Sequence, residues 1–297
     1  MEGDMVVVPG ARLHVERTGE GPALLLVSGG GGDAGMYADV IPLLARTFTV
    51  IAYDRRGNSR SPFTEPDASI TVPRQADDAV AVLDHYGFER AYVFGNSSGA
   101  IIALEMVTRY PRRLLGAVAH EPPLVQLLAP DSRERREIEH IGQIARDKHV
   151  MRAYAAFGAM TLPDPPRLFL SPTGQVVIAA ATRLMLAFGS LAQKIIRREP
   201  DVMIRQLRNA DLTTRRELPS FCFDYQPDLA ALAATTALWC LATGRDSAGK
   251  PYHATAHLLS ERLGVPCLEF PGGHVPYLQQ PEEFTATLTK ILEGFGR

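Results

Sequence analysis

Residues 91–107 read AYVFGNSSGAIIALEMV, and this stretch decides the fold class. Its first four residues are apolar and predict a buried strand, whereas the residues after Gly99 favour a helix. Between these two elements, Gly95-Asn96-Ser97-Ser98-Gly99 fits the pattern G-x-S-x-G. The glycines allow a tight strand-to-helix turn that exposes a serine hydroxyl, which makes Ser97 the candidate nucleophile. Ser98 is its rival, but the spacing to both glycines selects Ser97.

Apolar segments of strand length recur on both sides of this turn. They are continuously apolar rather than alternating, which is typical of strands buried on both faces of a parallel sheet. Helix-forming stretches lie between them, so the chain predicts a doubly wound, mostly parallel α/β sheet. The predicted strands are 23–27, 48–52, 91–94, 114–119, 237–242 and 265–270, and the predicted helices are 37–45, 73–86, 98–110, 254–263 and 281–295. Residues 5–16 predict a hairpin around Pro9-Gly10.

The alternation of strands and helices stops between residues 122 and 234. This segment has helical periodicity and proline-rich interruptions, which predicts an all-helical insertion. We therefore expect a core made of residues 1–121 and 235–297, with residues 122–234 as a cap over the carboxyl ends of the strands. The alternative is a stabilising subdomain that takes no part in ligand binding.

Composition narrows the class of protein. The 297 residues are 46% apolar and 22% charged, which excludes a disordered chain, a collagen-like fibre and a coiled coil. A formal net charge of −2 gives no general attraction to nucleic acid or anionic lipid, and we expect neither as a partner. Three cysteines without a CxxC pair predict neither a disulfide framework nor a metal site. The chain begins without a signal-peptide pattern and has no membrane-length apolar run, so we expect a soluble, cytoplasmic protein and leave a homodimer open.

A serine hydroxyl needs a base to act as a nucleophile. His274 lies in Phe270-Pro271-Gly272-Gly273-His274, directly after the last predicted strand and before the last helix. A loop at the carboxyl end of a parallel strand reaches the same sheet edge as Ser97, so His274 is the candidate base. The other seven histidines lie on the early hairpin, on predicted helices or in connections.

The oxyanion of acyl transfer needs preorganised N–H donors. One predicted donor is the backbone of Ser98, which follows the nucleophile, and the other is Gly30 in the glycine run after Val27. A phosphate-binding loop is excluded because no Lys-Ser/Thr follows the glycines. Residues that flank these groups are predicted to contact the substrate, namely Gly29, Gly31, Asn96 and Val275.

Over nearly its whole length the chain resembles the α/β-hydrolase superfamily. The resemblance rests on the glycine loop, Asp54-Arg55-Arg56-Gly57-Asn58-Ser59, the turn at Ser97 and the terminal Gly-Gly-His, which stand in the family's order. It implies an α/β-hydrolase fold and a triad in the order nucleophile, acid, histidine. Serine at the turn argues against the aspartate-based dehalogenases and epoxide hydrolases.

The resemblance leaves two candidates for the acid. Family proteins usually carry it after the strand before the last one, which offers Asp246. The residues from Ser97 to Glu121, and from Pro271 to Tyr277, look like the zearalenone lactonases, in which the acid stands at the position of Glu121. Glu121 is the first choice and Asp246 the alternative. The cap shares no motif with those lactonases, so their substrate is not carried over.

The expected activity is cleavage of a small apolar ester or lactone through an acyl-enzyme, with no metal or organic cofactor. The same triad also fits a thioesterase, a carbon–carbon bond hydrolase or a cofactor-free perhydrolase. An aminopeptidase-like hydrolase would need an acidic anchor, for which Glu199 and Asp201 are candidates. A binding protein without turnover is the alternative from another class. The bulky apolar residues of the cap that are candidates for the cleft or for cap packing are Met151, Tyr154, Phe157, Met160, Phe169, Met185, Phe188 and Met203.

Overall fold

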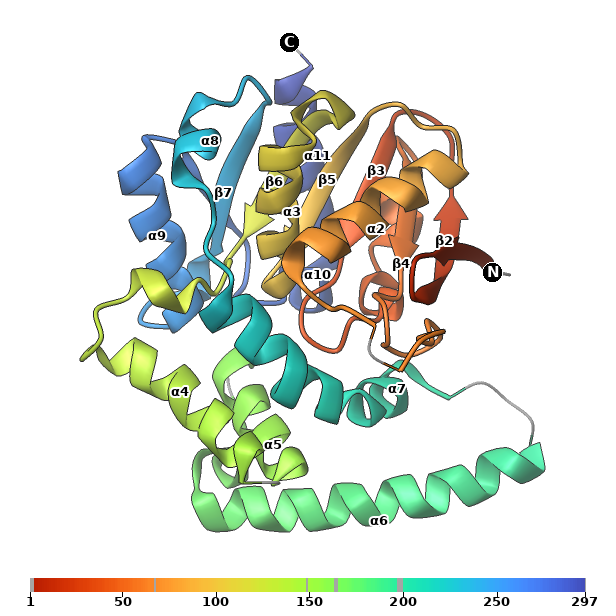
Figure 1. Ribbon diagram of the computed structural model, residues 1–297, viewed down its shortest axis with the longest axis vertical. Helices are drawn as coiled ribbons and strands as arrows, with labels where there is room; N and C mark the ends of the chain where they lie inside the picture. The colour runs from red at the N-terminus through yellow and green to blue at the C-terminus, as the bar shows by residue number, and fades with distance from the viewer. Residues whose placement is uncertain (1–2, 67, 148, 163–164, 197–199, 297) are drawn as a thin grey trace.

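The computed structural model describes residues 3–66, 68–147, 149–162, 165–196 and 200–296 (Figure 1). Within these residues, eight strands form one sheet in the order β1-β2-β4-β3-β5-β6-β7-β8. β1, β2 and β4 pair antiparallel, and the neighbours from β4 to β8 pair parallel, which confirms the predicted sheet. The strands are β1 (Asp4–Val8), β2 (Ala11–Thr18), β3 (Ala23–Val27), β4 (Thr49–Tyr53), β5 (Ala91–Asn96), β6 (Leu114–His120), β7 (Trp239–Gly244) and β8 (Cys267–Phe270).

Helices cover both faces of the sheet. One face packs against α2 (Val72–His85), α3 (Ser98–Arg109), α8 (Leu229–Ala234) and α9 (Pro251–Leu263). The other packs against η1 (Ala34–Tyr37), α1 (Ile41–Leu44), α10 (Pro276–Gln279) and α11 (Pro281–Phe295). Every residue of β3, β4 and β5 is buried between these layers, which explains why the segments are continuously apolar.

Two predicted helices differ from the structure by more than one residue at an end. The prediction of one helix over 37–45 is wrong, because η1 ends at Tyr37 and α1 begins only at Ile41. Pro42 lies in the first turn of α1, where its missing N–H costs nothing, whereas the same residue inside a continuous helix would break it. α9 begins at Pro251, three residues before the predicted start, and Pro251 occupies the first helical position for the same reason.

The segment between β6 and β7 is helical. It contains η3 (Val125–Leu127), α4 (Arg133–Arg146), α5 (Val150–Thr161), η4 (Arg167–Leu170), α6 (Pro172–Ile196), α7 (Val202–Arg208), the π-helical turns η5 (Leu212–Glu217) and η6 (Pro219–Asp224), and α8. Figure 1 shows α4 to α7 gathered beyond one end of the sheet. α8 packs on α3 and α9 instead, so the helices beyond the sheet end before residue 229.

The sheet has its topological switch point between β3 and β5. The chain leaves β3 toward β4 on one side and later enters β5 on the other. Loops that leave neighbouring strands in opposite directions open a crevice at the carboxyl end of the sheet. The loop after β3 contains Gly29–Gly32, and the turn after β5 contains Ser97.

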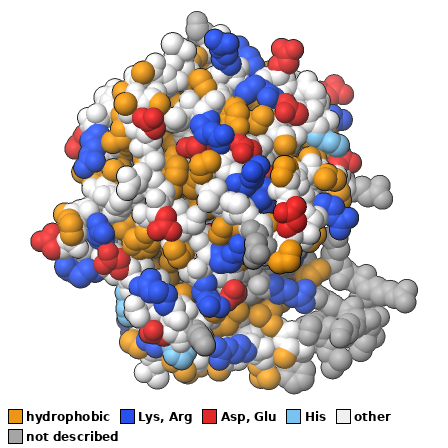
Figure 2. Space-filling view, in the orientation of Figure 1, with side chains coloured by type: hydrophobic (Ala, Val, Ile, Leu, Met, Phe, Trp, Pro, Cys, Tyr) orange, Lys and Arg blue, Asp and Glu red, His pale blue; other side chains and the backbone are white. Residues whose placement is uncertain are grey.

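Figure 2 shows cationic and anionic side chains interspersed over the face that it draws, with apolar side chains between them. Among the described residues, no helix is both long and apolar enough to cross a bilayer.

Candidate active site

Ser97 occupies the turn between β5 and α3 with φ 56° and ψ −123°, a backbone conformation that L-residues rarely adopt. A backbone hydrogen bond of 2.9 Å from Ser97 N to His120 O fixes this turn. A Cβ atom at Gly99 would lie 2.1 Å from Val27 O, so only glycine permits α3 to begin this close to β3. The turn therefore projects the Ser97 side chain out of the regular strand, at the switch point of the sheet.

His274 and Glu121 form a buried pair at the same edge. The imidazole Nδ1 lies 2.6 Å from Oε2 of Glu121, and the two side chains are 3% and 0% exposed. Asp246, the alternative acid, is exposed, and its backbone N–H donates to Gly272 O. The structure thus brings Glu121 to His274 and leaves Asp246 at the surface.

The carboxylate of Glu121 is held from several sides. Its φ is 53°, its backbone N–H donates to Ala242 O over 2.9 Å, and its Oε1 accepts the Gly244 N–H over 2.8 Å. Burial alone would raise the pKa of Glu121, but the neighbouring His120 and the hydrogen bond from His274 bring it down to about 2. Glu121 is therefore ionised at neutral pH and can stabilise a cationic imidazole at His274.

Asn96 connects the surrounding polar groups. Its Nδ2 donates to the backbone O of His274 over 2.8 Å and lies 3.1 Å from Nδ1 of His120, and its Oδ1 accepts the hydroxyl of Tyr277 over 3.0 Å. Asn96 borders a chamber beside Ser97, but these internal bonds occupy its amide. It holds the loop that carries His274 in place. Burial lowers the pKa of His120 to about 4, so this histidine is neutral at pH 7.

The loop after β3 passes directly beside the candidate nucleophile. A Cβ atom at Gly29 would lie 2.8 Å from Cβ of Ser97. Among the described residues, the backbone N–H groups of Gly30 and Ser98 have no intramolecular acceptor, and both residues border the space next to Ser97. Two such free donors are the requirement for binding an oxyanion.

A buried ion pair anchors this loop. The guanidinium of Arg55 donates from Nη1 and Nη2 to the two oxygens of Glu217 over 2.8 and 2.9 Å, and its Nη2 also donates to Gly29 O over 2.9 Å. Arg55 is 0% and Glu217 2% exposed. Glu217 belongs to η5, so the helical segment between β6 and β7 holds the carbonyl immediately before Gly30.

Two further contacts join the same segments. Arg205 of α7 forms hydrogen bonds of 2.7 and 2.8 Å with the carboxylate of Asp33, and Asn209 donates to Gly31 O over 2.7 Å. Gly31 does not border the space at Ser97; its carbonyl serves this contact instead. Asp201 caps α7 by accepting the Met203 N–H, and Glu199 lies outside the described residues.

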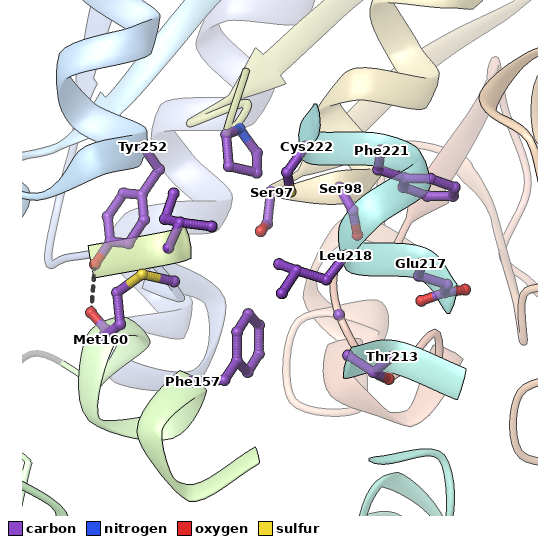
Figure 3. Close-up of a pocket in the computed structure, with 13 residues that line it drawn as sticks. Ser97, Ser98, Phe157, Met160, Thr213, Glu217, Leu218, Phe221, Cys222 and Tyr252 are labelled. Carbon is purple, nitrogen blue, oxygen red and sulfur yellow. Dashed lines mark hydrogen bonds between the residues drawn. The ribbon is translucent and has the colours of Figure 1, made fainter. Parts of the chain in front are cut away.

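Two chambers meet at Ser97. The inner chamber has a volume of about 30 Å³ and the outer chamber about 250 Å³, and Gly30 and Phe157 border both. Figure 3 shows the Phe157 ring pointing from α5 toward Ser97, with Tyr252 and Met160 on one side and Leu218 on the other. Gly29, Val275 and His274 border the outer chamber. Three bulky residues of the insertion line the site: Phe157 and Met160 border the inner chamber, and Tyr154 borders the outer one. Met203 is 57% exposed instead. The side chain of Phe188 lies outside those that the structure describes.

Tyr252 is a site residue that the sequence did not reveal. Its ring stacks on the His274 imidazole with centroids 3.7 Å apart and an interplanar angle of 26°. Its hydroxyl donates to the backbone O of Met160 over 3.0 Å. Within the described part of the chain, no group of three or more His, Cys, Asp or Glu side chains is arranged to hold a metal ion.

The chain is similar to known hydrolases in sequence and in fold. A family described as "alpha/beta hydrolase fold" matches residues 22–155. The uncharacterized hydrolase YraK of Bacillus subtilis (strain 168) is 30% identical over 291 residues, which cover 96% of this chain and 94% of the relative. Zearalenone hydrolase of Bionectria ochroleuca is 33% identical over 117 residues, 38% of this chain and 44% of the relative, which confirms a local resemblance. The enol-lactonase from Burkholderia xenovorans LB400 shares the fold with a TM-score of 0.68, at 18% identity over 98% of this chain and all (100%) of that one.

Proposed function

The chain belongs to the α/β-hydrolase fold family, and we propose that it is a serine hydrolase that cleaves a carboxylic ester or lactone. The observation that carries the proposal is the buried 2.6 Å contact of Glu121 with His274, at the sheet edge where the strained turn presents Ser97. The names of several relatives, among them a zearalenone hydrolase and an enol-lactonase, support this bond type.

In the proposed first step, Oγ of Ser97 attacks the carbonyl carbon while His274 takes the hydroxyl proton. Glu121 holds the imidazole in one tautomer and balances its positive charge. The backbone N–H groups of Gly30 and Ser98 donate to the oxyanion. The bond between the carbonyl carbon and the alcohol oxygen then breaks, and His274 gives its proton to that oxygen.

In the second step, water attacks the acyl-enzyme. His274 takes one proton from the water and returns it to Oγ of Ser97, so that the carboxylic acid leaves and the resting enzyme is restored. No cofactor takes part in either step. We propose that residues 122–234, apart from α8, cap this site, since Phe157, Met160 and Glu217 all border the space at Ser97.

A fluorophosphonate probe tests the proposal. The intact protein should gain the mass of one adduct, and Ser97→Ala should gain none. Ser98→Ala is the matched control, because it removes the rival hydroxyl and keeps the backbone N–H, so it should still be labelled. An unlabelled wild-type protein would contradict an activated serine and favour a binding protein. Rates on matched oxygen esters, thioesters and β-diketones then separate the ester hydrolase from a thioesterase or carbon–carbon bond hydrolase.

A further inference from the structure

The two chambers at Ser97 differ in which reacting group they contain. His274 borders only the outer chamber, and Ser98, whose N–H is a proposed oxyanion donor, borders only the inner one. Resting on the proposed function, we infer that the inner chamber holds the acyl group and the outer chamber the alcohol, so that the substrate is an ester of a two- or three-carbon acid with a bulky, uncharged alcohol.

The direction follows from proton transfer. The alcohol oxygen must receive its proton from the imidazole, and general-acid transfer needs hydrogen-bond contact. The alcohol must therefore leave into the chamber that His274 borders. The acyl group stays bonded to Oγ of Ser97 with its oxyanion on Gly30 and Ser98, so its carbon chain points into the inner chamber.

The size limit follows from the volume and the walls of the inner chamber. The centre of a water-sized group can move within only about 30 Å³ of the inner chamber, which leaves room for a small acyl group. The walls are closely packed core residues: Ile138 and Phe221 are 0% exposed, and Met160 is 4% exposed. One or two carbons beyond the carbonyl therefore fit, and a longer chain meets side chains that have no space to move into.

Phe157 separates the two chambers. A Cβ atom at Gly30 would lie 2.8 Å from Cζ of Phe157, so the tip of the ring closes against the glycine loop. The ring thus stops an acyl chain from passing out of the inner chamber into the larger space.

The outer chamber is about eight times larger, by 250 against 30 Å³. Met36, Tyr154 and Leu278 give it apolar walls, and none of its described lining residues is Lys, Arg, Asp or Glu. Leu278 is 44% exposed, which places it toward solvent. An uncharged aromatic or aliphatic alcohol fits this surface better than a sugar phosphate or a peptide, because a charged group would lose its hydration without gaining a partner.

The test is kcat/KM on 1-naphthyl acetate, butyrate and octanoate, which share one alcohol. We expect the wild-type protein to favour acetate over octanoate by about 100-fold or more. Phe157→Ala should raise the octanoate-to-acetate ratio at least about tenfold, because it joins the two chambers, and Met160→Ala, a separate wall variant, should shift the ratio in the same direction.

Leu278→Ala is the matched control, because it enlarges only the outer chamber. It should change the preference between naphthyl and ethyl acetate and leave the acyl-length ratio as in the wild-type protein. A wild-type preference for octanoate, or a ratio that responds to Leu278→Ala and not to Phe157→Ala or Met160→Ala, would overturn the inference while ester hydrolysis stands. Probe labelling without turnover of any ester would overturn it as well. If the protein showed no labelling and no turnover, the proposed function itself would be overturned.

Discussion

Glu121 reaches His274 across the end of the strand that separates them. Glu121 follows β6 and His274 follows β8, and β7 lies between the two in the sheet. The last residue of β7, Gly244, donates its N–H to Oε1 of Glu121 and so directs Oε2 toward the imidazole. Glu121 therefore occupies the position beside His274, and Asp246, two residues after Gly244, lies at the surface.

The first prediction separates the two carboxylates. Glu121→Gln should lower kcat by about 10³-fold or more, because a neutral amide cannot balance an imidazolium, whereas Asp246→Asn should keep kcat within about twofold. Steady-state kinetics on one chromogenic ester measures both. A large loss of kcat in Asp246→Asn with little change in Glu121→Gln would identify Asp246, which follows β7, as the acid.

The second prediction concerns Arg55 and Glu217. Glu217→Gln should lower the free energy of unfolding by about 3–5 kcal/mol, because it leaves a buried guanidinium without its charge partner. It should also lower kcat by about 100-fold, since Arg55, which donates to the Gly29 carbonyl beside Gly30, loses the carboxylate that orients it.

The double variant Arg55→Met/Glu217→Leu is the control for that pair. It replaces two buried charges with apolar groups of similar volume and should recover most of the stability but not the activity. Urea denaturation and ester kinetics on the same preparations test this. If kcat returned together with stability, the pair would serve the fold alone.

The third prediction is a pH dependence of stability. The pKa of His120 is about 4 in the folded protein, below the usual 6.5, so the unfolded chain binds the proton first as the pH falls. His120 therefore stabilises the fold fully above pH 6.5, and up to about 3 kcal/mol is lost between pH 6.5 and 4. His120→Gln, which keeps an acceptor for Asn96, should flatten the unfolding free energy over this range. Urea midpoints that fall equally in both proteins would show that other groups cause the loss.

The fourth prediction tests the ring stacked on His274. Tyr252→Leu should lower kcat about tenfold, because the imidazole loses the flat ring that fixes its plane. A tenfold loss of rate corresponds to about 1.4 kcal/mol of activation free energy. Tyr252→Phe keeps the ring and should keep kcat, while it loses about 1 kcal/mol of stability with the hydrogen bond to Met160. Equal activity losses in both variants would assign the effect to the hydroxyl.

Much of the fold follows from local sequence. The strands 23–27 and 91–94 are continuously apolar because both faces are covered. Gly-x-Ser-x-Gly between a strand and a helix predicts the tight turn in which Ser97 lies. The short elements around Tyr37 and Ile41 were not predicted correctly, since apolar periodicity does not show where a helix breaks before Pro42.

The site is only partly visible in the sequence. Ser97 and His274 each stand in a short glycine motif directly after a predicted strand, and the structure brings both to the outer chamber. The partnership of Arg55 with Glu217 spans 162 positions and has no local signal, because a buried salt bridge depends on how the insertion folds back. Tyr252 lies before the predicted helix 254–263 and in no motif, so its contact with His274 needs the three-dimensional structure.

The bond from Arg55 to Gly29 has a consequence for engineering and for the divergence of relatives. A designer who exchanged residues 122–234 for the corresponding segment of another hydrolase would import new chamber walls and, at the same time, remove the carboxylate that orients Arg55. Such a chimera would carry the donor's chamber walls and a Gly29 carbonyl whose partner, Arg55, is no longer held by Glu217. Functional grafts therefore need either an acidic side chain that meets Arg55 or a compensating change at position 55, and lineages that replaced this segment should show the two positions changing together.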